Sequence, residues 1–457
     1  MIKITCEDGL VVHKIYEFLS MSFPSYLGEN SIYVEVDLKA GKIKINSCDF
    51  NKVIYLEDES ENSINNIKVS IYKTLSEYMD YSSWGILTGV RPVKLTRKLL
   101  NLNSYKDTEN ILINKYLLSK EKAELSLKIA ETENKILESL NDESYSIYVH
   151  IPFCSSICSY CSFNSMLIDN DRIKNYVNEL VSEIEKESKY LKRNPTSIYI
   201  GGGTPTSIPI KELDKVLKVL NKNFNIPREF TVECGRSDSI DFEKLNLLKS
   251  YGVNRISINP QTINIKSSAL INRPIDIKDI EDKYELANKL GFESINMDLI
   301  LGLPGEDCED MKKSIKYIES LKPENITIHN LSLKKGSKLY ENEYNFGIKI
   351  NDAVNFSKSY LEKRNYYPYY LYRQKHIIGN GENIGYTRCG HESIYNIVMI
   401  EEFHDIIGFG MGASTKFVRN GKINQIINFK NMKDYLSRNS EIFNKKLEFY
   451  NEVRNVT

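Results

Sequence analysis

The sequence predicts an α/β protein built on an incomplete (β/α)6 barrel of the TIM type, with an N-terminal α/β domain and a C-terminal α+β cap. Three observations predict this fold. Strand-like and helix-like runs alternate six times in the middle of the chain, which is typical of a parallel sheet. The opening segment has a hairpin-like pattern instead, and the alternation ends before the C-terminal segment. We therefore place the domains at residues 1–140, 141–364 and 365–457.

The N-terminal domain combines short strand-like runs with amphipathic helices. Polar turns separate the strand-like runs, which are 1–6, 31–38, 41–47 and 51–57. Apolar residues recur with helical spacing in 13–23, 64–80 and 119–140. No cluster of catalytic residue types occurs here, so we expect the chemistry elsewhere.

The middle domain contains six βα units. Its strand-like runs are 146–152, 197–202, 229–235, 255–261, 294–302 and 325–331. The helical runs between and after them are 170–191, 210–222, 241–251, 276–290, 308–321 and 353–364. Such alternation requires parallel strands with right-handed crossovers. Six units are fewer than a closed (β/α)8 barrel contains, so an open barrel or a doubly wound sheet fits the pattern.

The C-terminal segment departs from this alternation. It contains a tyrosine-rich run at 365–376, glycine-rich loops at 379–386 and 408–415, and a polar helix after residue 430. For the tyrosines, packing of the cap is favoured over stacking on a planar ligand. Arg373, Lys375 and His376 either pair with substrate carboxylates or form a solvated basic patch.

Composition excludes several classes of protein. Lys plus Arg and Asp plus Glu both number 61, so the chain lacks the basic field of a nucleic-acid-binding protein. No run approaches the ~18 apolar residues of a membrane helix. The opening MIKITCEDGL does not resemble a secretory signal. We therefore expect a cytoplasmic protein whose cysteines form no disulfides.

Three of the eight cysteines, Cys154, Cys158 and Cys161, lie within eight residues. Structural thiols need no fixed spacing, and a redox CxxC pair leaves Cys154 unexplained. A zinc site needs a fourth ligand, which His150 could supply. An iron–sulfur cluster held by three thiolates leaves one iron open to a substrate. The spacing favours the cluster, and the other readings stay open.

Other polar groups follow the predicted strands where each one ends. They are Gly202, Gly203 and Thr204 after the second strand, Glu233 in the third, Gln261 after the fourth and Asp298 in the fifth. In parallel βα folds, ligands bind at the carboxyl ends of the strands. Any one of these groups could be a satisfied surface residue. Their succession around one edge predicts a binding site beside the cysteines.

The pattern Cys154-x-x-x-Cys158-x-Tyr160-Cys161 resembles the signature of radical S-adenosylmethionine enzymes. The preceding YVHIPFC is similar to the oxygen-independent coproporphyrinogen III oxidase group, and the resemblance extends over about residues 146–420. It implies a radical S-adenosylmethionine core, in which the three cysteines hold a 4Fe–4S cluster and the open iron binds S-adenosylmethionine. An oxygen-sensitive cluster of this kind implies an anaerobic setting.

The resemblance also implies roles for individual residues. The GGGTP loop is expected to hold the amino group of the methionine moiety, and Tyr148 and Tyr160 are expected to flank the cluster and the adenine. The residues expected around S-adenosylmethionine are Tyr148, Tyr160, Gly202, Gly203, Thr204, Glu233, Gln261, Arg273 and Asp298.

Longer stretches are similar to the HemZ-type coproporphyrinogen dehydrogenase branch, among them WGILTGVRPVKL (84–95) and ECGRSDSI (233–240). This similarity implies oxidative decarboxylation of two propionates of coproporphyrinogen III in haem biosynthesis, with a low-potential electron donor such as flavodoxin or ferredoxin. Typical decarboxylases have a further cysteine two positions after the third cluster cysteine, where this chain has Phe163. Haem chaperones of the HemW type likewise have phenylalanine two positions after the third cluster cysteine. The alternatives are therefore a haem-binding chaperone that keeps the cluster, or another radical reaction on a tetrapyrrole.

Overall fold

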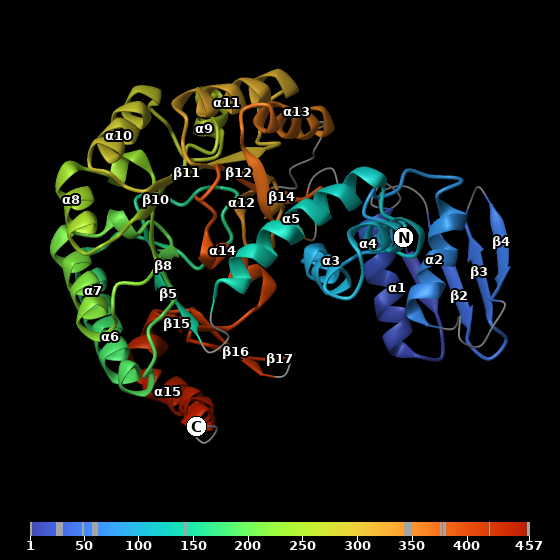
Figure 1. Ribbon diagram of the computed structural model, residues 1–457, viewed down its shortest axis with the longest axis horizontal. Helices are drawn as coiled ribbons and strands as arrows, with labels where there is room; N and C mark the ends of the chain where they lie inside the picture. Colours follow the sequence, from blue (N-terminus) through green and yellow to red (C-terminus); the bar gives the residue numbers. More distant parts are fainter. Residues whose placement is uncertain are drawn as a thin grey trace. The chain divides into compact units, whose positions relative to one another are not determined.

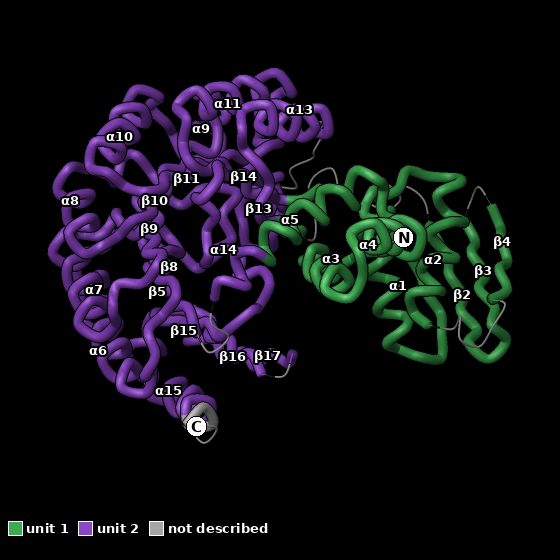
Figure 2. Tube along the Cα trace, in the orientation of Figure 1, with its two compact units in different colours: residues 1–134, 371–382 green, residues 135–370, 383–457 purple. Residues whose placement is uncertain are grey.

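The computed structural model describes residues 2–23, 31–47, 50–56, 63–140, 144–341, 350–374, 377, 381–419 and 421–454. The chain forms two compact units (Figure 2). Unit 1 comprises residues 1–134 and 371–382, and unit 2 comprises residues 135–370 and 383–457. The division into three domains at residues 140 and 364 stays a prediction.

Unit 1 contains a four-stranded sheet in the order β1-β2-β3-β4. Its strands are β1 (Ile2–Thr5), β2 (Ile32–Asp37), β3 (Lys42–Asn46) and β4 (Asn51–Tyr55). Its helices are α1 (Gly9–Ser22), α2 (Ile64–Leu75), α3 (Pro92–Leu100), α4 (Tyr105–Asn114) and most of α5 (Lys120–Glu138). The predicted strands and helices of the N-terminal segment are confirmed.

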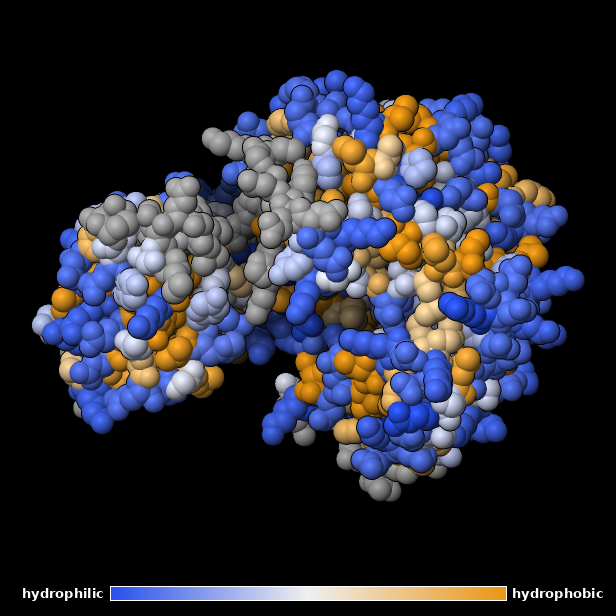
Figure 3. Space-filling view, turned by 180° about the vertical axis from the view of Figure 1, so that it is seen from behind, coloured by the Kyte–Doolittle hydropathy of each residue, from blue (hydrophilic) through white to orange (hydrophobic). Residues whose placement is uncertain are grey.

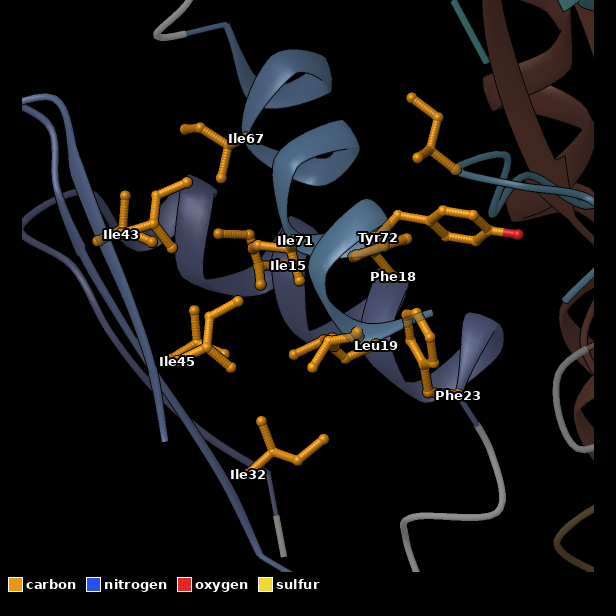
Figure 4. Packing of buried hydrophobic residues seen from close by; sticks show 14 of the residues in the cluster. Ile15, Phe18, Leu19, Phe23, Ile32, Ile43, Ile45, Ile67, Ile71 and Tyr72 are labelled. Carbon is orange, nitrogen blue, oxygen red and sulfur yellow. The ribbon is translucent and has the colours of Figure 1, made fainter. Parts of the chain in front are cut away.

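The core of unit 1 lies between one face of this sheet and the helices α1 and α2. Buried and exposed residues alternate along β2, which is the pattern of a sheet covered on one side. Figure 4 shows apolar side chains of α1 and α2, including Ile15 and Ile71, packed against Ile43 and Ile45 of β3. Full burial of such a side chain contributes about 1.5–3 kcal/mol.

Unit 2 is built on a sheet in the order β13-β14-β12-β11-β10-β9-β8-β5-β15-β16-β17. Its six central strands are β5 (Tyr145–Ile151), β8 (Ser197–Gly202), β9 (Glu229–Gly235), β10 (Arg255–Ile258), β11 (Ser294–Leu301) and β12 (Asn325–Asn330). Each pairs in parallel with the next along the chain. From β5 to β12, the spatial order of the six strands follows their order in the chain, whereas the order in a doubly wound sheet reverses at one point. Within the described ranges, the two edge strands of the sheet, β13 and β17, do not pair with each other. The open (β/α)6 barrel is confirmed.

Six helices follow these strands and form an outer arc in Figure 1. They are α6 (Asn170–Glu187), α7 (Ile210–Asn223), α8 (Phe242–Ser250), α10 (Ile277–Lys289), α11 (Cys308–Leu321) and α13 (Asn351–Glu362). α7 buries Leu213, Val216, Leu217 and Leu220, the spacing of one helical face. Two short helices, α9 (Ile265–Leu270) and α12 (Lys338–Glu341), were not predicted.

The C-terminal segment extends the sheet of unit 2 at both edges. Its elements are β13 (Tyr367–Tyr372), β14 (Asn383–Thr387), α14 (Ile394–Glu401), β15 (Asp405–Phe409), β16 (Ser414–Arg419), β17 (Lys422–Ile427) and α15 (Met432–Arg454). β14 runs antiparallel to β12, whereas β15 runs parallel to β5. The α+β content is as predicted, but its place beside β5 was not evident from the sequence.

The tyrosine-rich run packs in the interior, as its amphipathic rings suggested. Tyr366 and Tyr369 are each 1% exposed. Arg373 is equally buried, and its Nη1 donates to the carbonyl oxygen of Leu87 at 2.7 Å. Arg373 is therefore not part of a solvated basic patch, and its pairing with a substrate carboxylate stays a hypothesis. Lys375 and His376 lie outside the described residues.

In the described part of the chain, no helix combines the length and apolar character needed to cross a membrane. Figure 3 shows hydrophilic residues interspersed among hydrophobic ones over the face in view.

Candidate functional site at the carboxyl edge of the sheet

The three clustered cysteines lie on a loop, residues 153–168, that we call the cysteine loop. β6 (Phe153–Cys154) pairs with β7 (Met166–Leu167) and closes its two ends. In the middle, the Ser159 amide donates to the carbonyl of Ile271 at 2.9 Å, and the Ser159 carbonyl accepts from the Leu339 amide at 2.9 Å. The loop is therefore fixed both at its ends and between Cys158 and Tyr160.

Arg236 and Asp238, from the 233–240 motif, hold the cysteine loop from the side of β9. Arg236 Nη1 donates to Ser156 Oγ at 2.8 Å, and Nη2 donates to Asp238 Oδ2 at 2.8 Å. Asp238 also accepts from Ser155 Oγ at 3.4 Å. This pairing is a physical reason for arginine and aspartate in the motif.

Hydrogen-bond donors reach two of the three cysteine sulfurs. Thr204 Oγ1 lies 3.7 Å from Cys154 Sγ, and Arg273 Nη1 lies 3.7 Å from Cys158 Sγ. Arg273 is anchored by its Nη2, which donates to the carbonyls of Gly235 at 3.0 Å and Asn259 at 2.6 Å. Donors to sulfur stabilise thiolate charge and help to set the potential of a cluster.

The glycine run after β8 is pressed against the cysteine loop. Gly202 has a φ of +111°, and a β-carbon there would lie 2.4 Å from His150 Nδ1. A β-carbon at Gly203 would lie 2.7 Å from the carbonyl oxygen of Phe153. The amide of Thr204 donates to that same carbonyl at 2.8 Å. Glycine is required here because protein atoms already fill the space of a side chain.

Glu233 lies half-buried beside the glycine run. Its Oε2 accepts from the Gly202 amide at 3.3 Å, and its Oε1 accepts from Tyr199 Oη at 2.5 Å. Burial raises the pKa of Glu233, and the bond from Tyr199 opposes the rise. Within the described ranges, no Lys, Arg or His nitrogen forms an ion pair with this carboxylate. A half-buried carboxylate without a cation at this edge of the sheet is therefore a candidate partner for a positively charged ligand group.

Gln261 and Asp298 are joined through the backbone. The Gln261 amide donates to the Asp298 carbonyl at 3.0 Å, and Gln261 has a φ of +67°. Gln261 Oε1 is buried without a hydrogen-bond partner. Asp298 Oδ1 accepts from Asn296 at 2.7 Å, and His329 Nε2 lies 3.7 Å from Oδ2. Burial acts to raise the pKa of Asp298, but His329 and Asn296 hold it below its usual value.

The two tyrosines expected at the cofactor have different surroundings. Tyr148 Oη lies 3.1 Å from His150 Nδ1, and its ring lies near those of Tyr199 and Tyr395. For Tyr160, burial raises the pKa of the hydroxyl and Arg273 opposes the rise. Thus Tyr148 lies in the barrel interior and Tyr160 beside the cysteines.

The predicted site residues did not include Tyr199 or Tyr395, and the histidines, His329 among them, were considered as haem ligands or acid–base groups without an assigned role. Tyr199 had a signal, because two-residue alternation places it on the same face of β8 as Gly201 of the glycine run. His329 likewise lies in β12, directly before its last residue. No signal in the sequence could have identified Tyr395, because α14 belongs to the C-terminal segment and reaches β8 only in the folded chain.

These surroundings fit an iron–sulfur cluster better than a zinc ion. Among the described residues, no group of three or more His, Cys, Asp and Glu could hold a metal ion. His150 already has Nδ1 at 3.1 Å from Tyr148 Oη and Nε2 at 3.3 Å from the Asn164 carbonyl. A 4Fe–4S cluster offers each thiolate its own iron, so three cysteines need not converge on one point. The unpaired Gln261 oxygen fits a polar cofactor beside such a cluster.

Known proteins support this interpretation. The radical SAM superfamily model matches residues 148–318. The oxygen-independent coproporphyrinogen-III oxidase-like protein HemZ of Bacillus subtilis is 35% identical over 445 residues, 93% of this chain and 89% of that protein. The heme chaperone HemW of Bacillus subtilis is 32% identical over 59% of this chain and 70% of its own length.

The fold of coproporphyrinogen III oxidase (HemN) from Escherichia coli, described as a radical SAM enzyme, is also similar. The TM-score is 0.55 at 24% identity, over 68% of this chain and 72% of that one. The chain therefore belongs to the radical S-adenosylmethionine family, among the oxygen-independent coproporphyrinogen-III oxidase-like proteins, and its cofactors are those of the family, a 4Fe–4S cluster and S-adenosylmethionine.

Proposed function

We propose that this protein catalyses the oxygen-independent oxidative decarboxylation of coproporphyrinogen III to protoporphyrinogen IX. The extent of the similarity carries the proposal. The oxidase-like HemZ protein matches 93% of the chain, including the N-terminal segment, whereas the heme chaperone HemW of the same organism matches 59%. Held by Cys154, Cys158 and Cys161, a reduced cluster would supply one electron to cleave S-adenosylmethionine into methionine and a 5′-deoxyadenosyl radical, which would take a hydrogen atom from the β-carbon of a propionate. Loss of CO2 and transfer of one electron to a one-electron acceptor would then leave the vinyl group.

Cys154, Cys158 and Cys161 are the proposed cluster ligands. Thr204 and Arg273 donate toward two of the sulfurs, which stabilises negative charge on the thiolates. Because Arg273 is tied to backbone carbonyls at the ends of β9 and β10, it also fixes the position of the cysteine loop on the sheet.

Glu233 is the proposed partner of the amino group of S-adenosylmethionine. Its carboxylate is half-buried and has no cation among the described residues, so an ammonium group would supply the missing charge. Gly202, Gly203 and Thr204 hold the adjoining backbone against the cysteine loop, so the ammonium site and the sulfurs keep a fixed separation. Gln261, Asp298, Tyr148 and Tyr160 complete the proposed cofactor site.

Lysines after β12 are the proposed contacts for the substrate's propionates. Lys335 and Lys338 are exposed, and Lys334 is half-buried. Burial lowers the pKa of Lys334, and Cys161 opposes that change, which places this amine close to the third cysteine. A propionate carboxylate beside Lys334 would favour its charged form. The Leu339 amide, one residue after Lys338, donates to the cysteine loop.

Product analysis tests the proposal. Reduced, reconstituted protein is incubated without oxygen with S-adenosylmethionine and coproporphyrinogen III. We expect protoporphyrinogen IX, with one methionine and one CO2 released for each propionate lost. Release of methionine without loss of CO2 would contradict the decarboxylation.

A second candidate function is haem delivery by a chaperone that keeps the cluster. Phe163, at the position where typical decarboxylases have cysteine, favours it, as does the 32% identity to HemW. Stoichiometric haem binding without decarboxylation in the same assay would support this candidate.

A further inference from the structure

Three tyrosines from separate parts of unit 2 gather beside Glu233. They are Tyr148 of β5, Tyr199 of β8 and Tyr395 of α14. The rings of Tyr199 and Tyr395 stack with centroids 4.4 Å apart and planes inclined by 22°. The Tyr148 centroid lies 6.3 Å from that of Tyr199 and 6.2 Å from that of Tyr395. The cluster thus brings a residue of the C-terminal segment to the barrel interior.

The Glu233 carboxylate depends on Tyr199 for one of its two direct hydrogen bonds. Tyr199 Oη donates to Oε1 at 2.5 Å, and the weaker bond from the Gly202 amide reaches Oε2 at 3.3 Å. The other titratable groups that interact with Glu233 are Tyr148, Cys234, Tyr395, Asp298 and His329. Of these, only His329 favours the ionised carboxylate. Among the described residues, Tyr199 is therefore the one side chain that donates a hydrogen bond to this carboxylate.

The ring that stacks on Tyr199 belongs to Tyr395 at the start of α14, and this helix start is bound to β9. Glu229, four residues before Glu233 on β9, is 5% exposed and accepts three hydrogen bonds from the start of α14. Ser393 Oγ and the Tyr395 amide donate to its Oε1 at 3.0 Å, and the Ile394 amide donates to its Oε2 at 2.7 Å. A carboxylate at a helix N-terminus is stabilising. The start of α14 is thus fixed to β9, and the ring of Tyr395 stacks on the ring of Tyr199.

We propose that Tyr199, supported by Tyr395, is a positioning residue that orients the Glu233 carboxylate toward the amino group of S-adenosylmethionine. The inference rests on the proposed function of Glu233. It assigns the C-terminal segment a part in cofactor binding, through Tyr395.

A second tyrosine–carboxylate pair provides a matched experiment. Tyr199→Phe removes the hydroxyl that donates to Glu233, whereas Tyr251→Phe removes a hydroxyl that donates to Asp214 Oδ1 at 2.7 Å, outside the proposed site. Affinity for S-adenosylmethionine is measured by calorimetry on reconstituted protein, with iron content and melting temperature as controls. We expect Tyr199→Phe to bind roughly 10- to 100-fold more weakly, the range for a hydrogen bond to a charged group. Tyr251→Phe should bind normally, and Tyr395→Ala, which removes the ring stacked on Tyr199, should weaken binding.

The pH dependence of S-adenosylmethionine binding tests whether Tyr199 orients the Glu233 carboxylate or only packs beside it. Binding should decline as Glu233 protonates, and Tyr199→Phe should move that midpoint to higher pH because the ionised carboxylate loses a donor. Equal affinity and an equal midpoint in the two Phe variants would overturn the inference, as would loss of iron or folding in Tyr199→Phe. If Glu233→Gln itself binds normally, the proposed role of Glu233 fails instead.

Discussion

Two carboxylate sites of unit 2, one at the carboxyl edge of the sheet and one on its flank, have different partners. At the carboxyl edge of the sheet, Glu233 has hydrogen-bond donors but no cation within the described ranges. On the flank, Glu183 and Glu187 of α6 share Lys446 of α15. Lys446 Nζ lies 3.0 Å from Glu187 Oε1 and 3.5 Å from Glu183 Oε1. All three flank side chains are 0–2% exposed.

The flank network is satisfied by the protein itself. Glu183 accepts from Tyr435 Oη at 2.6 Å and from the Gly410 amide at 2.9 Å, and Glu187 accepts from Tyr450 Oη at 2.7 Å. These bonds fasten α15 to α6. A buried charge with a complete set of partners serves the fold, whereas one without a counter-charge is available to a ligand. The comparison therefore predicts activity defects at the edge and stability defects on the flank.

The largest effect is expected from the cysteine loop. Cys154→Ala, Cys158→Ala or Cys161→Ala should abolish cleavage of S-adenosylmethionine, because each removes one of the three proposed iron ligands. Iron and sulfide content and methionine release check this. Cys234→Ala, which removes a buried thiol outside the loop, is the control. Full cleavage in any loop variant would contradict the assignment.

On the flank, Lys446→Met should lower the free energy of unfolding by about 3–5 kcal/mol, because it leaves two carboxylates buried without their cation. Lys445→Met, at the neighbouring exposed position, should change little. Urea denaturation monitored by circular dichroism measures both. Once folded and reconstituted, Lys446→Met should bind S-adenosylmethionine normally. An unchanged unfolding free energy would mean that the network does not secure α15.

At the edge, Glu233→Gln should weaken binding of S-adenosylmethionine by roughly 10- to 100-fold, as expected for loss of a charge-assisted hydrogen bond, without loss of iron. In the parent protein, binding should fade as pH falls through the raised pKa of Glu233, and the variant should lack this dependence. A carboxyl whose folded pKa is raised subtracts stability at pH above that value. The cofactor-free variant should therefore be equally or more stable at neutral pH. A clear loss of stability would make Glu233 structural, like its counterparts on the flank.

The smallest effect is expected at the exposed substrate contacts. Lys338→Ala should raise the KM for coproporphyrinogen III up to about fivefold, since an exposed ion pair contributes about 0.2–1 kcal/mol. The KM for S-adenosylmethionine should not change. Lys316→Ala on α11, away from the cysteine loop, is the control. An equal rise in both KM values would point to a disturbed cysteine loop rather than to a lost carboxylate contact.

Local sequence patterns were enough to predict the strands and helices that carry the site. The two-residue alternation of apolar side chains in strands and their helical spacing in helices predicted the six βα units. Each strand or helix buries one apolar face, and this pattern is the same whichever element covers that face. The carboxyl ends of parallel strands share one edge, which brought the predicted Gly202, Glu233, Gln261 and Asp298 to the same place. The hydrogen bonds from Thr204 and Arg273 to cysteine sulfurs were not predicted, since they depend on how the loops pack.

The sequence by itself determined the barrel, the cysteine spacing and the polar groups that follow its strands, because these depend on residues close together in the chain. Only the tertiary structure decided that β15 pairs with β5, that Tyr395 supports Tyr199 and that Lys446 neutralises Glu183 across 263 positions. Such contacts leave no local periodicity, since either partner alone looks like an ordinary helix or strand residue. Whether a buried charge serves stability or chemistry is settled by its distant partner, and that partner is chosen only when the chain folds.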